Sequence, residues 1–147
     1  MKIMMTARAR VAVKRVYAEF TDSDGTRVLV DRLWPRGLTK DKARVDAWLR
    51  DLAPSNELRK WFHTHSQKPA EFRKRYLGEL KAASSAAKAF EQLHKLISTS
   101  ARVTLLFASK NAESNNATVL KEFIEGKSLK PKKAATERQR TVAGARK

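Results

Sequence analysis

The chain has 147 residues, of which 32 are Lys or Arg and 15 are Asp or Glu, and it contains no cysteine. This length suits one globular domain, and the lack of cysteine excludes disulfides, thiolate metal sites and a cysteine nucleophile. No apolar run reaches the roughly 20 residues that span a bilayer, and the first ten residues lack the apolar stretch of a signal peptide. We therefore expect a cytoplasmic protein without a membrane partner.

The net charge of +17 is unevenly distributed along the chain. Residues 127–147 hold eight basic residues and one acidic residue, with no aromatic residue and no apolar periodicity. Such a segment buries too little apolar surface to offset its ordering entropy, so we expect a disordered basic tail. We expect residues 1–10 to form a short N-terminal extension and residues 11–126 to form the folded domain.

Two β-branched runs near the start of the domain predict strands, one over 11–17 and one over 28–33. The turn residues 22–25 separate these strands, and the sequence Trp-Pro-Arg-Gly at 34–37 ends the second. Residues 45–53 match both the strand period and the helix period. The sequence therefore leaves their structure undecided.

Helices and a buried strand make up the rest of the domain. Ser55 is expected to be the N-cap of a helix, Pro69 suits a first helical position, and a third helix begins near Ser85. The apolar run 103–108 is typical of a strand buried on both faces, and a last helix is predicted over 116–125. Buried strands separated by helices predict a small single α/β domain, with a mostly parallel sheet and packed helices.

Arginines and an aspartate gather around the second predicted strand, at Arg27, Asp31, Arg32 and Arg36. Open α/β sheets bind ligands at the carboxyl ends of their strands, and arginine binds phosphate or carboxylate through paired hydrogen bonds. We therefore expect an anion clamp here, with Asp31 orienting an arginine or exchanging a proton. The structural alternative is an ion pair between Asp31 and an arginine that braces the turn at Trp34.

A second polar cluster follows the buried strand. Lys110 comes directly after it, and Asn115 and Asn116 begin the last predicted helix. The N-terminus of a helix favours anions, so this junction is a candidate anion site, although either asparagine is also an ordinary N-cap. Because a parallel sheet places strand ends side by side, we expect Lys110 to share one pocket with the arginines around Asp31.

Other chemistries find little support in the sequence. His63 and His65 do not have the spacing of zinc ligands on a helix, and we expect neither a metal nor a cofactor. No phosphate loop, dinucleotide fingerprint or nucleophile elbow is present. The three tryptophans are more typical of core and interface positions than of base stacking.

Four sequence blocks occur in order, at 24–37, 53–62, 72–80 and 104–111, and the first contains Leu-Val-Asp-Arg-Leu-Trp-Pro-Arg-Gly. From about Val13 to Phe123 they resemble the YeaO-like family of small bacterial proteins, also called domain of unknown function 488. The resemblance implies a compact α/β domain, a bacterial cytoplasmic origin and no established activity. The family tends to read Asn-His-Ala where residues 115–117 read Asn-Asn-Ala, so a mechanism that needs this histidine does not carry over. The extension after Gly126 lies outside the family's usual extent.

The sequence favours a binding module for a phosphate-bearing ligand, with nucleic acid as the leading example. The expected domain site comprises Arg27, Arg32, Arg36, Lys110, Asn115 and Asn116. The tail is expected to act as a nonspecific nucleic-acid arm through Lys127, Lys130, Lys132, Lys133, Arg138, Arg140, Arg146 and Lys147. Two alternatives stay open: an enzyme acting on a small anionic or nucleotide-like substrate, with Asp31 as acid or base, and a structural adaptor whose tail contacts acidic partners.

Overall fold

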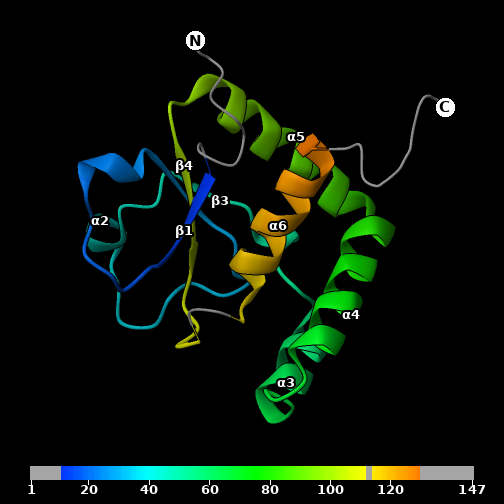
Figure 1. Cartoon of the computed structure of the whole chain (residues 1–147). Helices are drawn as coiled ribbons and strands as arrows, with labels where there is room; N and C mark the ends of the chain where they lie inside the picture. The colour runs from blue at the N-terminus through cyan, green and yellow to red at the C-terminus, as the bar shows by residue number, and fades with distance from the viewer. Residues whose placement is uncertain (1–10, 112–113, 130–147) are drawn as a thin grey trace, which may run out of the picture.

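A computed structural model describes residues 11–111 and 114–129, and these form a parallel sheet with helices packed around it (Figure 1). The sheet order is β1 (Val11–Arg15), β4 (Val103–Phe107), β2 (Thr26–Leu29) and β3 (Ala47–Trp48). All three pairings between neighbouring strands in this part of the chain are parallel. The prediction of a small α/β domain with a mostly parallel sheet is confirmed.

Most helices lie between β3 and β4 in the chain. They are α3 (Asn56–Thr64), α4 (Pro69–Ala82) and α5 (Ser84–Thr99), and α6 (Asn116–Leu129) follows β4. Figure 1 shows α3 to α6 on one side of the sheet, with the short α2 (Lys40–Ala43) on the other. Ser55 is the N-cap of α3, where its Oγ accepts a hydrogen bond from Leu58 N at 3.1 Å, and Pro69 begins α4, as predicted.

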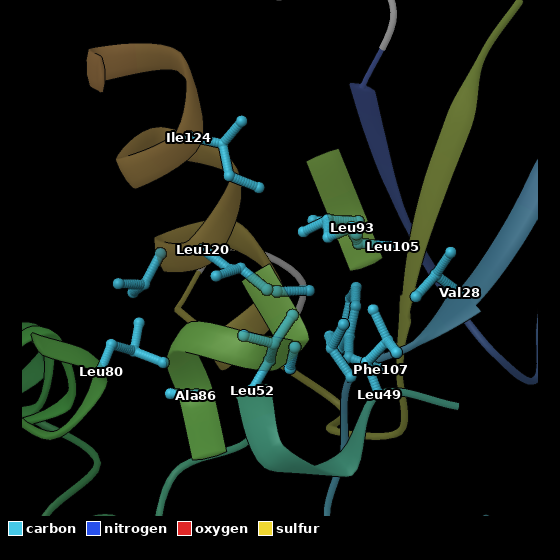
Figure 2. Close-up of a cluster of buried hydrophobic side chains, with 14 of the residues drawn as sticks. Val28, Leu49, Leu52, Leu80, Ala86, Leu93, Leu105, Phe107, Leu120 and Ile124 are labelled. Atoms are coloured by element: carbon cyan, nitrogen blue, oxygen red, sulfur yellow. The ribbon is translucent and has the colours of Figure 1, made fainter. Parts of the chain in front are cut away.

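The alternation of strand side chains divides the core into two clusters. Val28, Leu105 and Phe107 point into the larger cluster, which α4, α5 and α6 complete with side chains such as Leu93 and Leu120 (Figure 2). Leu29 and Leu106 point to the opposite face, where they pack with Ala43 and the partly buried tryptophans 34 and 48. Each central strand is therefore covered on both faces, as the apolar run 103–108 indicates.

The second strand is shorter than predicted, because β2 ends at Leu29 rather than Leu33. Val30 N still donates to Leu106 O at 3.1 Å. One residue later, the Asp31 carboxylate accepts the hydrogen bond from Ala108 N at 2.9 Å, so a side chain replaces the backbone carbonyl of the ladder. The undecided residues 45–53 contain the two-residue strand β3 and a single 3₁₀ turn, η2 (Arg50–Leu52). A 3₁₀ turn, η1 (Asp22–Asp24), also occupies the predicted turn between the first two strands.

The last helix is longer than predicted, because α6 continues to Leu129 instead of ending at Glu125. Gly126 suggests a C-terminal cap, but it is not among the glycines with positive φ that such a cap requires. Residues 127–129, predicted as the start of the disordered tail, are therefore helical. The predicted extension 1–10 and the rest of the tail, 130–147, lie outside the described residues. None of the described helices has the length and apolar character needed to cross a membrane.

Candidate anion-binding site

A cavity of about 810 Å³ lies beyond the carboxyl ends of β2 and β4. Six of the predicted site residues line it: Asp31, Arg32, Arg36, Lys110, Asn115 and Asn116. The two clusters meet because β2 and β4 are neighbours, with Leu29 opposite Leu106. The predicted convergence of Lys110 with the arginine cluster is therefore confirmed.

Asp31 joins the ends of the two strands to the start of α6. Its Oδ2 accepts from Ala108 N at 2.9 Å, and its Oδ1 accepts from Asn116 Nδ2 at 3.0 Å. Asn116 Nδ2 also donates to Val30 O at 2.9 Å. Burial raises the pKa of the Asp31 carboxyl, while these hydrogen bonds and the charge of Arg59 oppose the rise. No described residue forms an ion pair with Asp31, so the predicted Asp31–arginine pair is absent from this part of the chain.

Arg32 is half-buried and supports the loop that leads into α3. Its Nε donates to Pro54 O at 3.1 Å, and its Nη2 donates to Ala53 O at 3.2 Å. These contacts fix the guanidinium at the cavity wall. Arg32 therefore contributes positive charge to the cavity while two of its nitrogens serve the fold.

Three exposed cations at the cavity, Arg36, Arg59 and Lys110, have no side-chain hydrogen bond or ion pair with the described residues. The loops that carry two of them are nevertheless fixed. Tyr17 Oη donates to Arg36 O at 2.7 Å, and Arg15 donates to the carbonyls of Ala108 and Ser109, just before Lys110. These cations can therefore meet an anion without giving up a contact with the described part of the protein.

Asn115 has the role of the N-cap that the sequence left open. Its Oδ1 accepts from Thr118 N at 2.9 Å, and its Nδ2 donates to Asn111 O at 2.9 Å. Only 2% of Asn115 is exposed. Both asparagines of the predicted site therefore shape the cavity wall through contacts within the protein.

The assignment of Arg27 to the site is wrong. Arg27 lies near the start of β2, at the opposite end from the cavity, and is 1% exposed. Its Nη1 lies 2.5 Å from Asp24 Oδ2, while Nε and Nη2 donate to the carbonyls of Arg44 and Ala43. The strand begins at Thr26, so Arg27 belongs to its amino end and neutralises a buried carboxylate there.

Sequence reasoning missed Tyr17, Arg59 and His63 as lining residues. Arg59 and His63 come from α3, and only the packing of α3 beside the strand ends brings them to the cavity. No sequence signal marks them beyond a helical position. His65 instead stacks on Trp61 at 4.5 Å between ring centroids, and the described residues contain no cluster of three metal-binding side chains.

The chain matches the family described as "Inactive DUF488-N3 subclade" over residues 10–142. It belongs to this family. The resemblance to YeaO-like DUF488 proteins is thereby confirmed, and the match also covers much of the basic extension that we expected to lie outside the family.

The relatives of this DUF488 protein are bacterial and uncharacterized. Uncharacterized proteins of Mycobacterium bovis and Mycobacterium tuberculosis are each 41% identical to it over 123 residues, which is 84% of this chain and 100% of theirs. The uncharacterized protein YeaO of Escherichia coli is 40% identical over 114 residues, which is 78% of this chain and 96% of its own. No solved structure shows significant similarity to the chain.

Proposed function

We propose that this DUF488 protein is a cytoplasmic binding module for a phosphate-bearing ligand, and that the ligand enters the cavity at the ends of β2 and β4. The observation that carries the proposal is the group of three exposed cations, Arg36, Arg59 and Lys110, around one cavity. Arginine and lysine are the residues that recognise phosphate, and a cavity lined by one sign of charge concentrates ions of the other.

Two observations favour binding over catalysis. Both carboxylate oxygens of Asp31 already accept hydrogen bonds, and Asn116, which faces Asp31, has no titratable group to relay a proton. The family's description as an inactive subclade points the same way. An enzyme with Asp31 as acid or base is therefore the second candidate, supported by the raised pKa of this carboxyl.

We further propose that the basic tail supplements the cavity as a nonspecific arm on nucleic acid. Lys127 belongs to α6, and the seven other basic residues lie outside the described residues. Cations on a strand of phosphates release counterions whatever the base sequence, so the arm adds affinity without sequence preference.

The test is the binding of a fluorescently labelled 12-nucleotide single strand to the full chain, measured by fluorescence anisotropy. Arg36→Ala and Lys110→Ala are each expected to weaken binding about threefold to tenfold, the effect of one phosphate contact. The matched control is Lys88→Ala, which removes an exposed lysine of α5 that does not line the cavity. Equal affinities for all three variants would contradict the cavity as the binding site.

A further inference from the structure

We infer that the cavity accepts a nucleotide whose base is unpaired, with the phosphate against the cations and the base against Tyr17 and Leu33. This inference rests on the proposed function and narrows the ligand class. A nucleotide of this kind comes from two sources: a free mononucleotide or one unit of a single strand. Duplex nucleic acid keeps its bases stacked inside and offers the cavity only phosphates.

The first observation is where the exposed hydrophobic side chains lie. In the described part of the chain, the large hydrophobic residues with high exposure are Tyr17, at 40%, and Leu33, at 57%. A single exposed hydrophobic residue needs no explanation, but both of these line the cavity that carries the cations. Inorganic phosphate would leave this apolar surface in water, whereas a ligand with a planar apolar part would cover it.

The second observation is that Tyr17 is held in place although it is exposed. Its Oη donates to Arg36 O at 2.7 Å, and the Arg15 guanidinium lies 4.9 Å from the ring centroid. Arg15 in turn donates to the carbonyls of Ala108 and Ser109. A ring fixed in advance loses little conformational entropy when a base stacks on it, which is the condition for an effective stacking surface.

The same hydrogen bond joins the apolar and the cationic parts of the cavity. Because Tyr17 contacts the backbone of Arg36, the ring and one of the free cations sit on adjoining parts of the wall. Pro35 and Phe62 add apolar surface to the wall. A volume of about 810 Å³ falls in the range of small-molecule pockets, about 300–1,000 Å³, and leaves room for a base, a sugar and a phosphate together.

The test is isothermal titration calorimetry of the full chain with AMP and with inorganic phosphate. We expect AMP to bind at least about tenfold more tightly than phosphate, because stacking on an aromatic ring contributes on this order. Tyr17→Leu should reduce AMP affinity about tenfold while leaving phosphate affinity unchanged. Leu33→Ser, a change at an exposed position that does not threaten folding, should reduce AMP affinity about threefold. Lys88→Ala is the control for both ligands.

Two further titrations, with a 12-nucleotide thymidine strand and with a 12-base-pair duplex, identify the source of the nucleotide. Tight binding of AMP alone supports a free nucleotide, and tight binding of both AMP and the strand supports a nucleotide within a strand. Equal affinities for AMP and phosphate, or binding of AMP that is insensitive to Tyr17→Leu and Leu33→Ser, would overturn this inference and leave the proposed function standing. Binding of none of the probes would overturn both.

Discussion

Asp31 and Asn116 hold the candidate site together at the scale of single residues. The carboxylate links Ala108 N to Asn116 Nδ2, so the end of β2, the loop after β4 and the first turn of α6 share one hydrogen-bonded junction. The same carboxylate is a negative charge inside a cavity otherwise lined by cations. Asp31 therefore stabilises the shape of the site and opposes the binding of an anion.

Asp31→Asn separates these two effects. Removing the negative charge should raise the affinity for the labelled single strand about threefold to fivefold, which corresponds to roughly 1 kcal/mol of Coulomb energy. The new amide places an N–H against one of two donors, so the free energy of unfolding should fall by about 1–3 kcal/mol. Anisotropy and urea unfolding measure the two effects, and weaker binding by the folded variant would contradict this role of Asp31.

Asp24 provides a pH-dependent test at the other end of β2. Burial opposes ionisation of Asp24, but hydrogen bonds from Lys14, Thr21 and Arg27 lower its pKa from 3.8 to about 2. A lowered pKa gives stability that is fully present above the unfolded value. Folding should therefore lose stability as the pH falls from about 4 to about 2.

Asp24→Asn should abolish this pH dependence and cost about 3–5 kcal/mol at pH 7, because it leaves the buried guanidinium of Arg27 without its carboxylate. Urea unfolding monitored by circular dichroism measures both effects. Asp22→Asn, at an exposed position in the same turn, is the control and should behave like the unmodified chain.

At the scale of elements, local signals in the sequence predicted most helices and strands. Ser55, Pro69 and the apolar run 103–108 mark their elements because caps, fixed backbone angles and burial act over a few residues. The end of β2 could not be read in the same way, since it depends on Asp31 taking a hydrogen bond from a strand more than 70 residues away. The placement of Arg27 failed for a related reason, because the starting residue of β2 decides which end of the sheet the arginine faces.

Glycines at three positions give a graded test of the elements. Gly25 has φ +68°, and a Cβ there would lie 2.2 Å from the carbonyl oxygen of Arg102, so Gly25→Ala should prevent folding or lower stability by well over the roughly 1–3 kcal/mol of backbone strain alone. Gly37 has φ +83° and open space, so Gly37→Ala should cost only that strain.

Gly78 lies inside α4 with nothing within 4 Å, so Gly78→Ala should stabilise the protein by about 0.5–1 kcal/mol. Thermal melts of the three variants check the order of stability. A Gly25→Ala variant as stable as Gly37→Ala would contradict the close approach of the backbones at Gly25.

At the scale of the whole molecule, topology explains why the candidate site could be predicted in part. Lys110 and Arg36 come from distant parts of the sequence, yet both follow strands of one parallel sheet, and neighbouring parallel strands end at the same edge. Arg59 and Tyr17 reach the same cavity through the packing of α3 and of the segment after β1. No local pattern encodes that packing, so the sequence could not reveal them.

The distribution of charge over the whole chain predicts a strong salt dependence. If the tail lies along a phosphate backbone, replacing its seven basic residues after Leu129 by Gln in the full chain should flatten the slope of log affinity against log salt by several units, at about 0.7 per phosphate on a single strand. The cavity should still bind, because none of these residues lines it. Anisotropy between about 50 and 200 mM salt measures the slope, and identical slopes for the two proteins would exclude the tail as a binding arm.

The most direct test of the central claim is a titration of the full, ¹⁵N-labelled chain with AMP, followed through its backbone amide signals. The site predicts saturable shifts at Ala108, Ser109, Lys110 and Asn116, on the loop that joins β4 to α6, and at Arg36 across the cavity. Signals of α5 around Lys88 should stay in place. Shifts confined to residues 130–147, or spread over α5 while the loop after β4 does not respond, would contradict a phosphate-binding cavity at this edge of the sheet.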